Sequence, residues 1–311
     1  MLRRLAGFVA TLLVASAIVF VLLDLLPGDA AEAQLGTTAT PEAVAALRAS
    51  LGLDRPPIER YGAWISGLAH GDLGLSSSYG APVADLVAER LAVTLPLAAM
   101  AMAMTVVAAL SLGLFAASHH GRPGDLAVTT LSQVGLAVPG FWLAILLVLV
   151  FAVKLHWFAA GGFPGWDDSV LAGLKALLLP AIALAAVQTA VLTRVTRGAL
   201  LDVLQDDFVR TARAKGLTRG QALRRHVLRN AFVPVLTVMG LQFANLVTGT
   251  VVIENVFNLP GLGRLTFQAI ANRDLVVLRS VVMLFAAAVI TINLFVDLIQ
   301  AGVDPRLREQ L

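Results

Sequence analysis

Six long apolar stretches dominate the pattern of hydrophobic and polar positions along the chain. Four of them contain no charged residue, and the first and the last contain one acidic residue each, Asp24 and Asp297. A helix needs about 20 apolar residues to cross the hydrocarbon core of a bilayer, and it satisfies its own backbone groups there. The pattern therefore predicts an all-α membrane protein with six transmembrane helices, over residues 5–26, 95–117, 126–153, 176–193, 231–253 and 280–303.

The first stretch has some features of a cleaved signal peptide. Arg3 and Arg4 precede it, and Ala31-Glu32-Ala33 fits a cleavage site. The hydrophobic region of a signal peptide runs about 7–15 residues, which is shorter than the apolar run 5–26. We therefore expect residues 1–26 to form a retained N-terminal transmembrane helix.

Composition agrees with a membrane protein. Hydrophobic residues make up 58% of the chain and charged residues 14%, whereas soluble domains carry about 25% charged residues. The chain has no cysteine, which excludes disulfides and thiolate chemistry.

The distribution of Lys and Arg predicts the orientation in the membrane. Of the 23 basic residues, 14 fall in the short set of exposed segments 1–4, 118–125, 194–230 and 304–311. The other nine are spread over the longer segments between the remaining spans. Cytoplasmic segments carry the excess of basic residues. We therefore expect both termini, including a tail over 304–311, to face the cytoplasm.

The exposed segment 27–94 is too long for a simple connection and carries its own helix signals. Thr40-Pro41 fits an N-cap followed by proline at the first helical position, and Gly52 ends that helix. A second helix is expected to start near Pro57 and to end before Gly71. Their apolar faces predict a small helical cap on the periplasmic side.

Within the core region 95–303, residues 206–234 predict a helix, a turn and a second helix. Asp206-Asp207 place negative charge at a helix start, and Gly216 suits a left-handed helix end. Thr218 and Gln221 match a capping box. The residues alone leave two alternatives open, an interfacial helix held by anionic lipid and a docking element for a soluble partner. The basic residues lack interleaved aromatic residues, so nucleic-acid binding is not expected.

This segment resembles the "EAA" coupling loop of ABC import permeases, in particular the B-type permease subunit of the dipeptide, oligopeptide and nickel importers. The resemblance rests on residues 210–217 and 225–231 with Pro234, although Arg210-Thr211-Ala212 stands where the consensus has Glu-Ala-Ala. Further stretches agree at 25–29, 51–56, 70–74, 254–257, 260–264 and 304–306.

The resemblance implies a type I ABC importer permease fold. It also implies a second, homologous permease, two cytoplasmic ATPases that bind ATP and Mg²⁺, and a periplasmic solute-binding protein. The residues that it assigns to ATPase coupling are Arg210, Thr211, Ala212, Arg213, Lys215, Gly216 and Leu217. Independently, the chain contains no Gly-Lys dipeptide and hence no phosphate-binding G-x-x-x-x-G-K-[ST] loop, so any ATP hydrolysis must belong to a partner.

Two further sets of residues are candidates for transport itself. Polar residues within spans either line a pathway or bond neighbouring helices. They are Ser132, Gln133, Gln188, Gln242 and Asn245. The segment after the fifth span is either an ordinary turn or a gate at the periplasmic side. Its candidate residues are Glu254, Asn255, Phe257, Pro260, Gly261 and Gly263.

The expected function is that of a permease in the bacterial inner membrane, embedded in the lipid bilayer, that moves short peptides by alternating access. The same architecture with nickel chelates or glutathione as cargo remains an alternative. An ion-coupled secondary transporter is the alternative from another class, but it calls for acidic residues in the middle of spans, and these are absent. No catalytic constellation, cofactor site or metal site is expected in this chain, because its five histidines form no ligand set.

Overall fold

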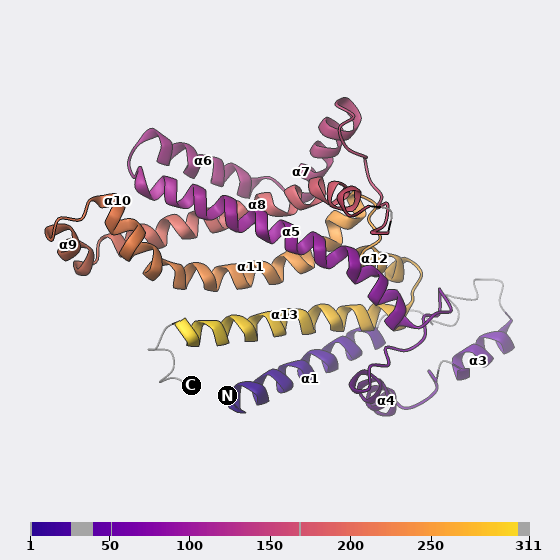
Figure 1. Cartoon of the computed structure of the whole chain (residues 1–311). Coiled ribbons are helices and arrows are strands. Elements are labelled where there is room, and N and C mark those ends of the chain that lie inside the picture. The colour runs from indigo at the N-terminus through magenta and orange to yellow at the C-terminus, as the bar shows by residue number, and fades with distance from the viewer. Residues whose placement is uncertain (1, 26–39, 51, 168, 304–311) are drawn as a thin grey trace. The chain divides into compact units, whose positions relative to one another are not determined.

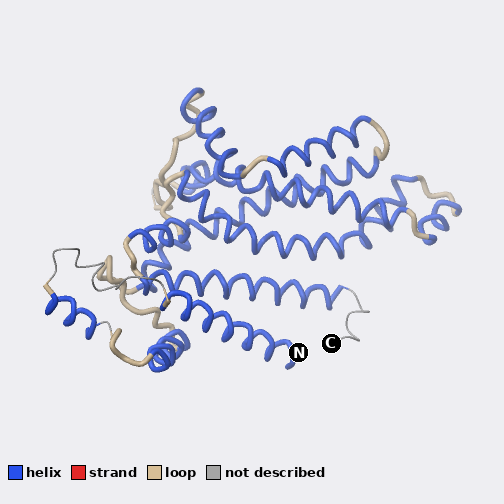
Figure 2. Tube along the Cα trace, turned by 180° about the vertical axis from the view of Figure 1, so that it is seen from behind, coloured by secondary structure: helices blue, strands red, loops and turns tan. Residues whose placement is uncertain are grey.

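A computed structural model describes residues 2–25, 40–50, 52–167 and 169–303. Helices make up most of this part of the chain (Figure 2). One isolated bridge pairs Leu75 with Pro82. The cleavage-like Ala31-Glu32-Ala33 and the predicted tail 304–311 lie outside the described residues.

The described chain divides into two compact units. The first unit combines Met1–Thr94 with Leu259–Thr291, and the second combines Leu95–Asn258 with Ile292–Leu311. Figure 1 labels the helices, of which α5 and α13 begin in the first unit and continue into the second. The helices that begin in the first unit are α1 (Leu2–Asp24), α3 (Pro41–Ser50), α4 (Pro57–Ala69), α5 (Val83–Ser118), α12 (Leu262–Ala271) and α13 (Leu275–Val303). Those of the second unit are α6 (Pro123–Ala137), α7 (Gly140–Leu147), α8 (Val170–Leu204), α9 (Asp207–Ala214), α10 (Arg219–Ala222) and α11 (Leu228–Val256), with π-helical stretches η1 (Val148–Lys154) and η2 (Leu223–Val227).

Five helices of the described chain are long and apolar enough to cross a membrane, namely α1, α5, α8, α11 and α13. The third span was predicted as one helix over 126–153. The structure instead has two helices there, α6 and α7, with a bend of 97° between them. Pro139 lacks an N–H, and the residue before a proline avoids the helical region. Val138 accordingly is extended, at φ −87° and ψ 120°. Only if this bent pair counts as one span does the number reach the predicted six.

Two other predicted boundaries shift. Helix α8 runs on to Leu204, well past the predicted end of the fourth span at residue 193. The fifth span was predicted over 231–253, but α11 is longer at both ends, from Leu228 to Val256, and contains Pro234. Because η2 connects α10 directly to α11, the chain stays helical from Arg219 to Val256.

The core of the first unit lies where α5, α12 and α13 meet. Val83, Leu265 and Val277 have no exposed surface there. The buried Asp274 caps α13 by accepting a hydrogen bond from the amide of Val277 (3.1 Å), and it also accepts one from the hydroxyl of Ser76 (2.6 Å). The segment before α5 is therefore tied to the start of α13.

The helices predicted between residues 40 and 71 are present as α3 and α4. The amide of Ala43 donates to the side-chain oxygen of Thr40 (3.3 Å), as an N-cap at that position requires. Helix α4 begins with Pro57 and ends just before Gly71.

In the second unit, α6, α7 and α11 pack against α8. A small residue brings α11 close to the last part of α13, because a Cβ on Gly240 would overlap the side chain of Val296. Helices α9 and α10 lie at one end of the pair formed by α8 and α11 (Figure 1).

Candidate functional site: the helix pair 206–222

The helix pair α9–α10 is built by short-range capping interactions. Helix α9 ends in a Schellman motif, in which the amide of Leu217 donates to the carbonyl oxygen of Ala212 (3.3 Å) and the amide of Gly216 to that of Arg213 (3.0 Å). Gly216 adopts φ +97°, a conformation that residues with a Cβ rarely take. The glycine stop predicted from the sequence is therefore confirmed at Gly216.

The start of the second helix has the predicted capping box. The amide of Thr218 donates to the side-chain oxygen of Gln221 (2.9 Å), and the amide of Gln221 donates to the hydroxyl of Thr218 (3.3 Å). Two backbone donors are satisfied in this way, so a turn of four residues, 215–218, is fixed between the two helices.

A buried apolar cluster attaches the helix pair to the helices beside it. Val209 of α9 is 1% exposed, and Ala222 at the end of α10 has no exposed surface. They pack with Leu200 of α8 and with Ala117 of α5. Three basic residues of α9 and of the turn after it are exposed, namely Arg210, Arg213 and Lys215. The helix pair therefore presents a basic outer surface on an apolar base.

An ion-pair cluster beside the helix pair was missed by the sequence prediction. Arg197 of α8 contacts the buried carboxylate of Asp125 with two nitrogens, Nε to Oδ1 and Nη2 to Oδ2 (2.8 Å). His120 lies 3.2 Å from both partners, and the amide of Gly121 donates to Asp125 (3.0 Å). The sequence gives no local signal for this cluster, because 72 residues separate Asp125 from Arg197.

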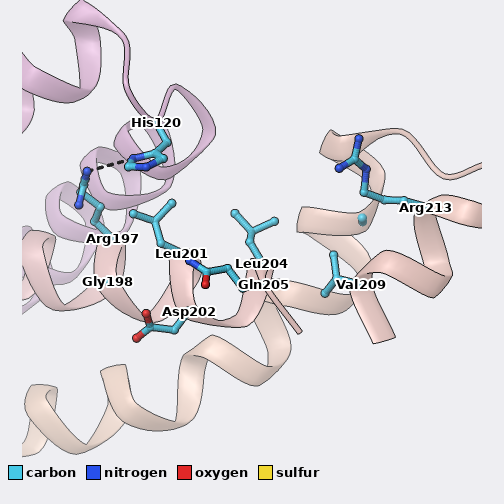
Figure 3. Close-up of a pocket in the computed structure, with 10 residues that line it drawn as sticks. His120, Arg197, Gly198, Leu201, Asp202, Leu204, Gln205, Val209 and Arg213 are labelled. Atoms are coloured by element: carbon cyan, nitrogen blue, oxygen red, sulfur yellow. Dashed lines mark hydrogen bonds between the residues drawn. The ribbon is translucent and has the colours of Figure 1, made fainter. Parts of the chain in front are cut away.

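A cavity of about 520 Å³ lies between this ion-pair cluster and α9. Figure 3 shows His120 and Arg197 near one end of it, Arg213 near the other, and Leu201 and Leu204 between them. The cavity thus combines an apolar middle with basic groups at both ends. Among the residues that the structure describes, no group of three or more His, Asp or Glu could hold a metal ion.

The five candidate pathway residues do not share one environment. The side-chain nitrogen of the buried Gln242 donates to the carbonyl oxygen of Gln188 (3.0 Å), which is the interhelical bonding left open as an alternative. Ser132 is buried, bonds to Val128 of its own helix, and borders an apolar cavity of about 450 Å³ between α5, α6 and α8. Gln133 and Asn245 are exposed. A pathway lined by these residues stays a prediction.

The candidate gate residues are divided between the two units. In the second unit, Glu254 and Phe257 are buried at the end of α11, and the carbonyl oxygen of Phe257 accepts from the amide of Gly162 (2.9 Å). Asn255 bonds to the carbonyl oxygen of Val251 in the same helix (2.7 Å). A Cβ on Gly161 would overlap the Phe257 carbonyl, so only glycine allows this approach.

In the first unit, Gly261 caps α12, and Gly263 lies buried in its first turn. Pro260 is half-buried just before them. The amide of Leu262 donates to the hydroxyl of Thr94 (2.9 Å), which ties the start of α12 to α5. A gate formed by these residues stays a prediction.

Comparisons with known proteins cover nearly the whole chain. A family model for the "binding-protein-dependent transport system inner membrane component" matches residues 109–309, and a model for the N-terminal part of such membrane components matches residues 1–98. A putative peptide transport system permease protein of Brucella abortus is 43% identical over 307 residues, covering 99% of this chain and 98% of that protein. A glutathione transport system permease protein of Escherichia coli is 39% identical over the same shares of both chains.

Solved structures agree on the fold. An inward-facing methionine ABC transporter matches with a TM-score of 0.58 at 18% identity, covering 70% of this chain and 96% of that chain. A chain of an amino acid ABC transporter matches with a TM-score of 0.56 at 18% identity, covering 70% and 94%.

Proposed function

Because this chain belongs to the family of binding-protein-dependent transport system inner membrane components, we propose that it is a permease subunit that imports short peptides with energy from partner ATPases. The chain is a multi-pass protein of the bacterial inner membrane. The observation that carries the proposal is the capped helix pair α9–α10, which presents exposed basic residues at the end of two membrane-spanning helices.

The helix pair is the proposed docking element for the ATPases. Residues 210–217 would contact a groove on an ATPase, and ATP and Mg²⁺ would be bound by that partner. The excess of basic residues around this segment supports a cytoplasmic position for it and for both termini. A second, homologous permease would complete the pathway, and a solute-binding protein would deliver cargo at the opposite side.

The buried base of the helix pair supports a rigid transmission of movement. Val209 and Ala222 are packed against α8 and α5, and α10 continues through η2 into α11. A displacement of α9–α10 by ATPase closure would therefore move α8 and α11 with it, because well-packed helices shift as units rather than deform. This is the proposed basis of alternating access.

Short peptides are the proposed substrate class because of the relatives' names. The Brucella relative is named for peptide transport, and the Escherichia coli relative for glutathione, which is itself a tripeptide. The absence of acidic residues in the middle of the apolar spans argues against the alternative of an ion-coupled transporter.

Deletion of residues 210–217 tests the docking proposal. We expect the deleted chain to insert into the membrane but to lose the ATPases on affinity purification of the complex. An eight-residue deletion of 41–48 within α3 is the matched control and should keep the ATPases bound. Co-purification of an intact complex after deletion of 210–217 would refute the proposed role.

Uptake into proteoliposomes tests the energy source and the cargo. The complete complex should accumulate a labelled dipeptide only with ATP on the ATPase side, and a protonophore should leave the rate unchanged. Uptake driven by an ion gradient without ATP would establish the ion-coupled alternative. Glutathione uptake in the absence of dipeptide uptake would narrow the substrate to the second relative's class.

A further inference from the structure

An aromatic and basic cluster in the first unit joins the end of α1 to α4 and to the start of α13. We call it the Phe20 cluster, and it consists of Phe20, Asp24, Arg60, Trp64 and Arg279. The guanidinium of Arg279 lies 5.0 Å from the ring centre of Phe20 and 5.2 Å from that of Trp64. Both distances fall within cation–π range, so this guanidinium packs against both rings, which stack with their centres 6.2 Å apart.

The charges of the cluster do not cancel. Arg60 forms a two-point ion pair with Asp24, with Nη1 to Oδ1 at 2.7 Å and Nη2 to Oδ2 at 3.0 Å. Arg279 forms no hydrogen bond or ion pair with any residue that the structure describes. Two arginines and one aspartate leave the Phe20 cluster with one net positive charge.

The cluster also has more hydrogen-bond donors than acceptors. Three buried nitrogens of the cluster have no acceptor among the described residues, namely Nε of Arg60, Nε of Arg279 and Nε1 of Trp64. Guanidinium and indole nitrogens are donors only, and both oxygens of Asp24, the acceptor in the cluster, already bind Arg60. A group that brings several acceptor oxygens and a negative charge would complement it.

The surroundings of the cluster indicate which group that is. Asp24 ends the candidate span α1, and Arg279 lies in the second turn of the candidate span α13, so the cluster lies at the ends of two spans. Apolar side chains beside it face outward: Leu22 on α1 is 61% exposed and Ile58 on α4 is 76% exposed. Tryptophan is enriched at the level of lipid headgroups. A bilayer would cover these apolar surfaces and place headgroups at the cluster.

We propose that the Phe20 cluster is a binding site for an anionic phospholipid, with the Arg279 guanidinium donating to the headgroup phosphate. Arginine presents a planar fork that matches two phosphate oxygens, and the contacts with the two rings restrict the orientation of that fork. The net positive charge favours a headgroup such as phosphatidylglycerol over phosphatidylcholine, whose trimethylammonium group the arginines repel. The site needs neither ATPases nor cargo, so it stands apart from the proposed function.

Lipid titration of the purified full chain tests the site. Delipidated protein in detergent is titrated with phosphatidylglycerol and with phosphatidylcholine of matched acyl chains, and bound lipid is counted by native mass spectrometry. We expect one phosphatidylglycerol site with at least about tenfold preference over phosphatidylcholine, and loss of that preference in Arg279→Gln. Arg55→Gln removes the same charge from an exposed position before α4 and should leave the preference intact.

Three outcomes overturn the proposal. Equal phosphatidylglycerol affinity of the wild type and Arg279→Gln excludes Arg279 as the binding group. An equal loss of the phosphatidylglycerol preference in Arg279→Gln and Arg55→Gln would show that the preference comes from general surface charge. Displacement of the lipid by millimolar dipeptide, with dipeptide binding lost in Arg279→Gln, would make the cluster a substrate site. If Arg279→Gln does not give monodisperse protein, Arg279→Lys is measured in its place. Lysine keeps the charge but lacks the planar guanidinium, so phosphatidylglycerol binding should weaken severalfold.

Discussion

Substitution of Gly216 by alanine tests how much the left-handed backbone conformation contributes to the α9–α10 turn, because the added Cβ does not change the packing. A Cβ at Gly216 would meet no atom within 4 Å, so the substitution introduces no steric clash. The φ of +97° nevertheless costs an L-residue about 1–2 kcal/mol. Alanine also lowers the conformational entropy of the unfolded chain, which offsets this cost by about 0.4–1 kcal/mol. The net loss in the free energy of forming this turn should be about 1 kcal/mol.

Gly220 supplies a matched control four residues further on. Its Cβ would also meet no atom within 4 Å, but it lies in α10 without a positive φ. Alanine there should stabilise the helix by about 0.5–1 kcal/mol. The two alanine variants should therefore differ by about 2 kcal/mol, which corresponds to roughly thirtyfold in the equilibrium for local opening.

Hydrogen–deuterium exchange of the full chain in nanodiscs measures this difference. The amides of Gly216 and Leu217 are bonded within the Schellman motif and report directly on its opening. We expect faster exchange in Gly216→Ala and unchanged or slower exchange in Gly220→Ala, with a parallel loss of bound ATPases in the first variant only. Equal exchange in the two variants would refute the argument that the left-handed conformation of Gly216 holds the turn.

Three further variants probe contacts outside the turn. Asp125→Ala leaves Arg197 without its two-point partner and should lower the free energy of unfolding by about 2–3 kcal/mol, seen as a lower thermal midpoint in detergent. Gly161→Ala forces a Cβ into the Phe257 carbonyl and should cost about 1–3 kcal/mol, seen as faster proteolysis of the loop 155–167. Asp274→Ala removes the cap of α13 and should cost at least about 1 kcal/mol, seen as faster amide exchange in its first turn.

Controls of the same residue types accompany these variants. Asp207 is 94% exposed at its side chain, and Asp207→Ala should change the midpoint little. Gly140 has its nearest atom 3.9 Å from a built Cβ, so Gly140→Ala should leave the proteolysis rate unchanged. An Asp125→Ala midpoint equal to that of Asp207→Ala would show that the ion pair with Arg197 contributes no stability.

Features encoded by neighbouring residues could be predicted from the sequence. The turn at Gly216 and the capping box of Thr218 and Gln221 depend on backbone groups only a few residues away, and both are present as predicted. The apolar runs likewise predicted the spans, because length and hydrophobicity are local properties. The bend at Pro139 has a local signal as well, although the proline alone did not show that the helix would break rather than kink.

Features that depend on distant residues could not be predicted in this way. Polarity grouped Gln242 and Asn245 as candidate pathway residues, yet Gln242 is buried against α8 while Asn245 is exposed, since the neighbouring helix decides the environment. The Phe20 cluster likewise depends on segments far apart in the chain. The contacts of Arg279 with Phe20 and Trp64 bring together residues of α1, α4 and α13.

The bond between Ser76 and Asp274 joins residues 198 positions apart, and it has a consequence for recombination between permeases. One family model ends at residue 98 and the next begins at residue 109, which suggests a natural crossover point for chimeras. The first unit, however, is completed by Leu259–Thr291, whose Leu265 and Val277 bury Val83 and Val87. A chimera joined near residue 100 would pair two halves of this core from different parents. Exchange of 1–94 together with 259–291 keeps the core from one parent and should yield the better-folded hybrid.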